Sequence, residues 1–248
     1  MKQLGLIGHP LTHSFSKKYY DKKFEKEGIN GYLYKLFDLE TIEEFSELLK
    51  NKSLIGVNVT IPYKKEVIPF LDKIDEEANS IQAVNCIRIE RKAGTPYLTG
   101  FNTDIIGFKN SLTPLLKPVH ASALILGNGG AAQAVKKALS DLNIHFNIIS
   151  RNPKSSGQFA YHEIDKKMMQ DNLLVINCSP LGTFPEIEKM PDIPYQYITK
   201  DHLFYDLIYN PEETKFLEAA RKAGALTKNG YEMLVLQAEE NWKIWNDK

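Results

Sequence analysis

Short apolar runs alternate with amphipathic stretches through the first hundred residues. The predicted strands span 4–8, 32–39 and 55–61, and the predicted helices span 14–28, 41–49 and 65–71. Two further strand patterns, at 83–90 and 96–101, flank a charged turn that contains Gly94, which is typical of a hairpin. The first hundred residues therefore form an α/β unit of their own.

A second alternation of apolar and amphipathic segments follows the first. A helix is predicted at 102–115, strands at 123–126, 146–150, 173–177 and 203–208, and helices at 131–142, 213–223 and 231–245. Strands that alternate with helices in this way indicate a parallel sheet. The last helix carries an apolar stripe that includes both tryptophans, so we expect it to face a core.

These patterns predict an α/β fold with two domains. The first is an α/β substrate domain at residues 1–101, completed by the C-terminal helix at 231–248. The second is a Rossmann-type doubly wound domain at residues 102–230. We expect a cleft between the two domains, lined by polar residues that follow strands of the first.

A glycine-rich turn connects the first predicted strand of the second domain to the helix that follows it. In Gly127-Asn-Gly-Gly-Ala-Ala132, Gly127 allows a sharp turn, Gly129 allows the backbone to approach a pyrophosphate, and Ala132 allows close helix packing. Arg151 follows the next strand, where an NAD-binding protein usually carries an acid. Because a cation there suits a 2′-phosphate, the pattern predicts NADP. The competing interpretation is a plain glycine turn followed by a solvated arginine.

Composition narrows the range of partners. Among 248 residues, 43% are hydrophobic, and Lys plus Arg equals Asp plus Glu at 31 each. Because the chain has no excess of positive charge to attract nucleic acid or an acidic membrane surface, the composition indicates a small-molecule partner. Cys86 and Cys178 lie far apart, which predicts packing thiols and no metal site. No stretch approaches the ~20 apolar residues of a membrane span, so we expect a soluble, cytoplasmic protein.

Polar residues end apolar segments of the first domain. In Asn58-Val-Thr-Ile-Pro-Tyr-Lys64, Asn58 and Thr60 project to one side of a strand, and the proline turns Lys64 out beyond its end. Ser14 and Ser16 begin a basic helix, where a carboxylate would meet hydrogen-bond donors and a favourable dipole. Each cluster has an ordinary alternative, a strand terminus in one case and a helix cap in the other.

Two more polar residues extend this group. Asn85 interrupts an apolar strand, and Asp104 begins the helix at the domain junction. Asp104 is placed to pair with Lys64 across the cleft, which would orient a lysine able to exchange a proton with a reacting oxygen. The alternative role of Asp104 is a simple helix cap.

Taken in order, these fragments resemble the motifs of the shikimate dehydrogenase family along nearly the whole chain. The matching fragments are Ser14 with Ser16, Asn58 to Lys64, Ala83 to Asn85, Asn102 to Asp104, Asp206 to Pro211, and Gly230 to Ala238. The resemblance implies NADP-dependent, reversible reduction of 3-dehydroshikimate to shikimate, a step of chorismate and aromatic amino-acid biosynthesis. It favours a monomer and leaves a homodimer open.

The resemblance also implies residue roles. Lys64 and Asp104 would be catalytic, and no metal is required. Ser14, Ser16 and Tyr209 would hold the substrate carboxylate, and Asn58, Thr60, Asn85, Asp104 and Gln237 would bind its hydroxyls. The cofactor would be held by Gly127, Asn128, Gly129, Gly130, Ala131, Arg151 and Asn152, with Gly230 and Met233 on the nicotinamide side. Two alternatives stay open, a quinate/shikimate dehydrogenase and a noncatalytic NADP-binding sensor.

Overall fold

The computed structural model describes residues 1–11 and 14–247, and its contacts divide the chain into two units. Unit 1 comprises Met1–Ile106 with Val235–Lys248, and unit 2 comprises Gly107–Leu234. The predicted domain boundaries fall at the starts of α4 (Thr103–Leu112) and α8 (Tyr231–Asn246), whereas the contacts divide each of these helices between the units. Within the described ranges, every helix is too short or too polar to cross a membrane.

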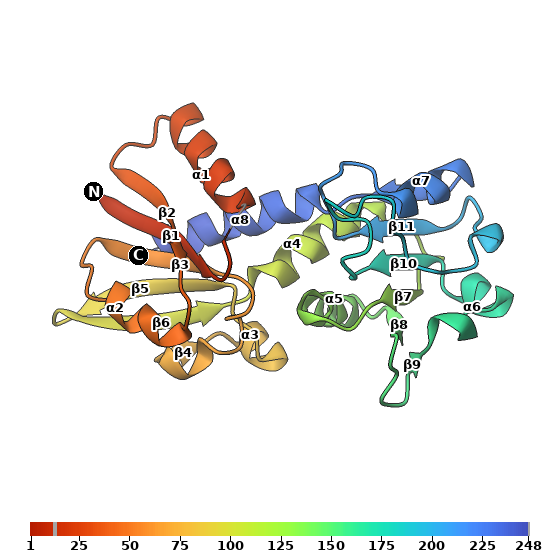
Figure 1. Cartoon of the computed structure of the whole chain (residues 1–248), viewed down its shortest axis with the longest axis horizontal. Helices are drawn as coiled ribbons and strands as arrows, with labels where there is room; N and C mark the ends of the chain where they lie inside the picture. The colour runs from red at the N-terminus through yellow and green to blue at the C-terminus, as the bar shows by residue number, and fades with distance from the viewer. Residues whose placement is uncertain (12–13, 248) are drawn as a thin grey trace. The chain divides into compact units, whose positions relative to one another are not determined.

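Unit 1 contains a mixed six-stranded sheet (Figure 1). Its strands are β1 (Lys2–Gly8), β2 (Tyr32–Asp38), β3 (Leu54–Val59), β4 (Lys73–Ile74), β5 (Cys86–Lys92) and β6 (Thr95–Phe101), in the order β2-β1-β3-β5-β6-β4. The predicted hairpin is confirmed, because β5 and β6 pair antiparallel. Ala93 and Gly94 both have positive φ, 50° and 86°, which suits a tight two-residue turn.

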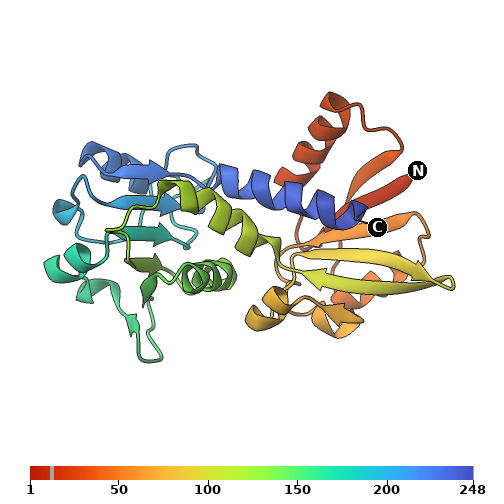
Figure 2. The same ribbon diagram turned by 180° about the vertical axis from the view of Figure 1, so that it is seen from behind.

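Helices cover both faces of this sheet. Helix α1 (Phe15–Lys26) and α8 share one core cluster, in which the rings of Tyr20 and Tyr34 stack at 4.7 Å. Figure 2 shows α8 crossing in front of the strands, and Trp245 Nε1 at its end donates to the Ile87 carbonyl at 3.0 Å. The other face packs against short helices, with Phe45 fully buried in that cluster. The C-terminal helix is therefore an integral layer of unit 1.

The short helices of unit 1 differ from the sequence prediction. The segment 41–49 forms a 3₁₀ turn, η1 (Ile42–Glu44), followed by one turn of α2 (Phe45–Leu48). The predicted helix at 65–71 is wrong beyond a single 3₁₀ turn, η2 (Ile68–Phe70). Pro69 explains the difference, because it lacks an amide hydrogen and its ring clashes with the carbonyl one turn earlier. Helix α3 (Glu76–Ile81) was outside the predicted elements.

Unit 2 is a doubly wound parallel sheet. Its strands are β7 (Ser122–Leu126), β8 (His145–Ile149), β9 (Gln158–Phe159), β10 (Leu174–Asn177), β11 (Leu203–Asp206) and β12 (Leu226–Lys228). Its helices are α5 (Gly130–Asp141), α6 (Lys166–Asp171) and α7 (Lys215–Lys222), with 3₁₀ turns η3 (Thr113–Leu115), η4 (Tyr161–Glu163) and η5 (Tyr195–Tyr197). The strand order, β12-β11-β10-β7-β8-β9, reverses direction between β7 and β10. Ligands of such sheets bind at the carboxyl ends of the strands beside that switch point.

A buried carboxylate joins two of the loops at the carboxyl edge of this sheet. Asp206, at the end of β11, is fully buried and accepts hydrogen bonds from Asn177 Nδ2 and Ile208 N at 3.0 Å and from Thr214 Oγ1 at 2.6 Å. It forms no ion pair with the described residues. Burial raises the pKa of Asp206 to about 6, although the hydrogen bonds oppose the shift.

We predict that this carboxylate makes stability fall as the pH rises. Because the folded-state pKa of Asp206 lies above its unfolded value near ~4, its contribution is full below about pH 4 and is lost as pH rises through about 6. Asp206→Asn lacks this titration and serves as the reference. The free energy of unfolding of the unmodified chain, measured relative to that of the variant, should fall by about 3 kcal/mol as the pH rises through that range. Urea denaturation at several pH values measures this difference.

The exposed Asp192 supplies the control for this experiment. The stability of Asp192→Asn should follow that of the unmodified chain at every pH. A constant gap between the unmodified chain and Asp206→Asn would contradict the prediction.

Candidate functional site

Lys64 and Asp104 form an ion pair in unit 1. Lys64 Nζ lies 2.6 Å from Asp104 Oδ2, and the side chains are 27% and 15% exposed. Lys64 follows the end of β3, and Asp104 lies in the first turn of α4. Asp104 Oδ1 makes no hydrogen bond with the described residues. The pair therefore holds a partly exposed ammonium in a defined direction and keeps one carboxylate oxygen available.

The pair lies within unit 1, whereas the sequence predicts it across a cleft between domains. The reason is that α4 begins in contact with the same chain segment that holds Lys64. The Lys64 carbonyl accepts a hydrogen bond from Val84 N at 2.7 Å, and Asn85 Oδ1 accepts one from Thr103 N at 2.8 Å. The segment around Asn85 thus ties both partners of the ion pair to one sheet.

Asn58 and Asn85 are buried beside the pair, each 4% exposed. Asn58 Nδ2 donates to the Asn85 carbonyl at 3.2 Å, and Asn58 Oδ1 accepts from the Tyr34 hydroxyl at 2.7 Å. Asn85 Nδ2 makes no hydrogen bond with any described residue. Asn85 therefore presents an available donor, while its side-chain oxygen is already in use.

Helix α8 joins the same set of hydrogen bonds. Thr103 Oγ1 donates to Asn241 Oδ1 at 2.7 Å, and Asn241 Nδ2 donates to Gln237 Oε1 at 2.9 Å. Asn241 is fully buried and Gln237 is 5% exposed. The predicted substrate residue Gln237 is thus connected to Asn85 through two residues that the sequence did not single out.

The other predicted substrate residues occupy different positions. Ser14 caps α1 by accepting a backbone hydrogen bond from its first turn at 3.1 Å. Burial raises the pKa of the Tyr34 phenol, and nearby Ser16 opposes that shift. Thr60 is partly buried just beyond β3, and Tyr209 belongs to unit 2, where it is 39% exposed. Their contacts with a substrate stay predictions.

A pocket of about 420 Å³ lies at the carboxyl edge of the unit 2 sheet. It is lined by Gly127, Asn128, Gly129, Ser150, Arg151, Asn152, Tyr161, Cys178, Ser179, Pro180 and Leu181. The lining segments follow β7, β8 and β10, so the pocket sits at the switch point of the strand order. The structure thereby brings together the predicted glycine loop and Arg151.

The glycine loop has the geometry that anion binding requires. Gly127 has φ of +104°, and a Cβ there would lie 3.2 Å from Ser179 N. Gly129 caps α5, and a Cβ on it would meet no atom within 4 Å. Backbone can therefore approach a ligand closely at Gly129, and the first amides of α5 open toward the same point.

Arg151 contributes a cation to this pocket. It is exposed, and its guanidinium forms no hydrogen bond or ion pair with the described residues. Asn152 beside it lines the pocket as well. A guanidinium without a protein partner, next to a glycine loop, fits the phosphorylated ribose of NADP.

Cys178 also lines the pocket. Burial raises the pKa of its thiol well above the usual range, and the nearby Asp206 charge adds to the shift. The thiol therefore stays protonated at neutral pH, which favours packing over nucleophilic chemistry.

Four predicted cofactor residues are not among the residues that line this pocket. Gly130 and Ala131 form the first turn of α5, and Gly230 and Met233 lie at the start of α8. At Gly230 the backbone passes so close to Leu207 that a Cβ would lie 2.1 Å from its carbonyl oxygen. This contact gives Gly230 a packing role, and the nicotinamide roles of Gly230 and Met233 stay predictions.

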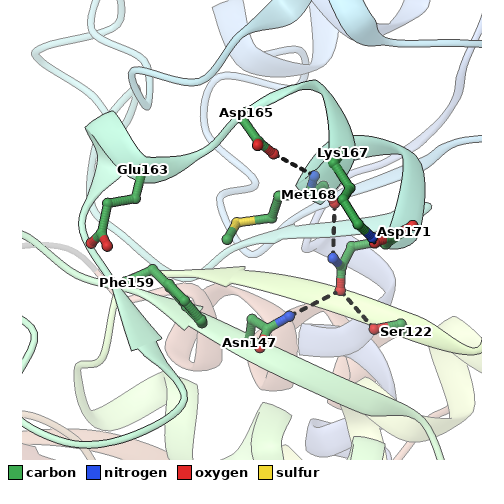
Figure 3. Close-up of a pocket in the computed structure, with 9 residues that line it drawn as sticks. Ser122, Asn147, Phe159, Glu163, Asp165, Lys167, Met168 and Asp171 are labelled. Carbon is green, nitrogen blue, oxygen red and sulfur yellow. Dashed lines mark hydrogen bonds and ion pairs between the residues drawn. The ribbon is translucent and has the colours of Figure 1, made fainter.

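A second pocket of unit 2, of about 410 Å³, is shown in Figure 3. It lies toward the amino ends of the strands, with Ser122 at the start of β7. Its polar groups satisfy one another: Ser122 Oγ donates to Asn172 Oδ1 at 2.6 Å, Asn172 Nδ2 donates to the Met168 carbonyl at 2.8 Å, and Lys167 pairs with Asp171. We assign no ligand to it, because its groups already have partners.

The residues of these sites that sequence reasoning left without a role include Tyr34, Thr103, Asn241 and Tyr161. Asn241 carried a usable signal, because it interrupts the apolar stripe of the last helix four residues after Gln237, on the same helix face. Tyr161 carried none, since the strand before it, β9, has only two residues.

Comparisons with known proteins agree with this architecture. A sequence model of the shikimate dehydrogenase substrate binding domain matches residues 6–87. The shikimate dehydrogenase (NADP(+)) of Methanococcus vannielii is 35% identical over 98% of this chain and 90% of its own length.

Solved structures extend the likeness. A chorismate mutase/shikimate 5-dehydrogenase fusion protein from Clostridium acetobutylicum has a TM-score of 0.88 at 36% identity, covering 100% of this chain and 92% of its own. The shikimate 5-dehydrogenase of Thermus thermophilus, solved with NADP(H) and shikimate, has a TM-score of 0.84 at 29% identity and covers 99% and 94%. With both units matched over nearly their full length, the chain belongs to the shikimate dehydrogenase family.

Proposed function

We propose that this chain catalyses the reversible, NADP-dependent reduction of 3-dehydroshikimate to shikimate, a step toward chorismate and the aromatic amino acids. Membership of the family supports the reaction. The Lys64–Asp104 ion pair at 2.6 Å carries the argument for catalysis, because a noncatalytic sensor would need neither partner. The pocket with Arg151 supports NADP as the cofactor.

Lys64 acts on the oxygen where charge develops. Bound NADPH supplies a hydride to the substrate carbonyl carbon. As negative charge grows on the carbonyl oxygen, the Lys64 ammonium stabilises it and donates a proton. Asp104 orients that ammonium through its Oδ2, and its unpaired Oδ1 can accept a hydrogen bond from a substrate hydroxyl.

Unit 1 supplies most of the groups that bind the substrate in this proposal. Asn85 Nδ2 donates to a ring oxygen, since it has no partner among the described residues. The remaining binding groups are those of Ser14, Ser16, Asn58, Thr60, Tyr209 and Gln237. On the cofactor side, Arg151 and Asn152 bind the 2′-phosphate, the glycine loop binds the pyrophosphate, and Gly230 and Met233 contact the nicotinamide.

We also propose the partner class, the location and the oligomeric state of the enzyme. The partner is a small molecule, with neither nucleic acid nor a membrane involved, and the equal counts of acidic and basic residues support this assignment. We place the enzyme in the cytoplasm, as a monomer, with a homodimer as the alternative state.

We predict that the purified chain oxidises shikimate with NADP⁺ in preference to all other pairings of shikimate or quinate with NADP⁺ or NAD⁺. A steady-state assay that crosses the two substrates and two cofactors measures the four values of kcat/KM. Highest activity with quinate and NAD⁺ would identify the alternative enzyme. No oxidation of either acid would favour the sensor.

Lys64→Ala should lower kcat by about 10²-fold or more while leaving shikimate affinity largely intact, because the lysine acts mainly as a proton-transfer group. Steady-state kinetics and direct shikimate titration measure the two effects. The matched control is Lys65→Ala, which removes the exposed neighbouring ammonium and should leave kcat unchanged. Full turnover by Lys64→Ala would remove Lys64 from the reaction.

Arg151→Ala should weaken NADP⁺ binding by about ten- to a hundredfold and leave NAD⁺ binding nearly unchanged, because the lost charge-assisted contacts involve only the 2′-phosphate. Dissociation constants from fluorescence titration test this. Lys154→Ala, which removes another exposed cation of the same loop, is the control. Equal weakening of both cofactors would refute the assignment of Arg151.

A further inference from the structure

One wall of the unit 2 pocket comes from a residue without an assigned role, Tyr161. The chain returns from β8 to the parallel strand β9 through residues 150–157, which contain no helix. Ser150 N donates to the Phe159 carbonyl at 2.9 Å, so the pairing of the two strands continues to their carboxyl ends. Tyr161 begins η4 just after β9, and it lines the same pocket as Arg151, which follows β8.

The Tyr161 ring is anchored while its hydroxyl has no protein partner. The ring packs against the core cluster of unit 2, and the side chain is partly buried. The hydroxyl makes no hydrogen bond with the described residues. An anchored phenol that lines a pocket and lacks a partner points to a ligand atom as its acceptor.

The neighbouring charge indicates which acceptor that is. Burial raises the pKa of Tyr161, and the nearby Arg151 charge opposes the shift. The phenol therefore keeps its proton at neutral pH and can act only as a donor toward an anion. Arg151 itself has no anionic partner among the described residues. An anion held by Arg151 would lie within the pocket that Tyr161 lines.

We propose that Tyr161 is a specificity-determining residue that donates a hydrogen bond to the 2′-phosphate held by Arg151. The inference rests on the proposed NADP dependence of this pocket. A phosphate dianion offers three oxygens beyond the ester bond, and one guanidinium satisfies at most two of them through its fork. The Tyr161 hydroxyl supplies a further donor from the turn that follows the neighbouring strand β9. Since NAD lacks this phosphate, the hydrogen bond strengthens the binding of NADP and leaves that of NAD unchanged.

Tyr161→Phe tests the hydroxyl while retaining the packed ring. We expect the dissociation constant for NADP⁺ to rise about tenfold and that for NAD⁺ to stay unchanged, because one hydrogen bond to a charged group is lost. Fluorescence titration of the full chain with each cofactor gives both values without any substrate present.

The matched control is Tyr195→Phe. Tyr195 packs against the same core cluster as Tyr161, but it lies outside the pocket and donates to the Pro191 carbonyl at 2.7 Å. Its substitution should leave both dissociation constants unchanged, even where stability falls. In an Arg151→Ala background, Tyr161→Phe should have a smaller effect on NADP⁺ than in the unmodified chain, because the two groups share one phosphate.

Two results would overturn the inference. An unchanged NADP⁺ dissociation constant would show that the hydroxyl contacts no cofactor atom, and equal weakening of NADP⁺ and NAD⁺ would place its contact on the part that they share. Failure of the unmodified chain to oxidise shikimate would count against the proposed reaction only. The ratio of NADP⁺ to NAD⁺ affinity decides the role of Tyr161 independently.

Discussion

The arrangement of unit 1 depends on the need of buried polar groups for partners. An unpaired amide or hydroxyl in the interior costs about 1–3 kcal/mol, so each side chain turns toward the partner that its neighbours allow. Hydrogen bonds of this kind link Tyr34, Asn58, Asn85, Thr103 and Asn241 across β2, β3, the residue before β5, α4 and α8. The same bonds hold α4 in place, and with it the carboxylate that orients Lys64. Packing alone would not set those rotamers.

This network also decides what the site offers to a ligand. Because Asn85 uses its oxygen for Thr103 and keeps its Nδ2 available, it presents a donor. Lys64 presents donors as well, and Asp104 Oδ1 is the available acceptor beside them. A molecule rich in oxygen acceptors with adjacent hydroxyl donors fits that distribution, whereas an apolar or cationic molecule does not. The polarity of the site thus follows from hydrogen bonds made behind it.

The fold was largely predictable because its determinants are local. Apolar runs indicated all of the longer strands, and the glycine loop and Arg151, both singled out in the sequence, line one pocket of unit 2. The sequence predicted that Lys64 pairs with Asp104, but it placed the pair across a cleft between domains. The pair lies within unit 1 because the start of α4 belongs to that unit, which depends on tertiary contacts. Short elements such as β9 and residues such as Tyr34 and Asn241 were missed, since their roles arise from neighbours that are distant in the sequence. At 65–71, proline chemistry overrode the helical spacing.

In unit 2, the same need of buried polar groups for partners distinguishes the residues that support the pocket loops from those that line the pocket. Asn177 and Asp206 meet behind the pocket loops with their hydrogen bonds satisfied inside the protein, and they hold those loops without facing a ligand. Arg151 and Tyr161 line the pocket and have no hydrogen-bond partner among the described residues. Buried groups with complete hydrogen bonds therefore position the wall, and the pocket groups without protein partners are available to a ligand. The shift of the Asp206 pKa to about 6 is the energetic consequence of that supporting role, because a carboxylate without a cation holds the loops only at the expense of its own desolvation.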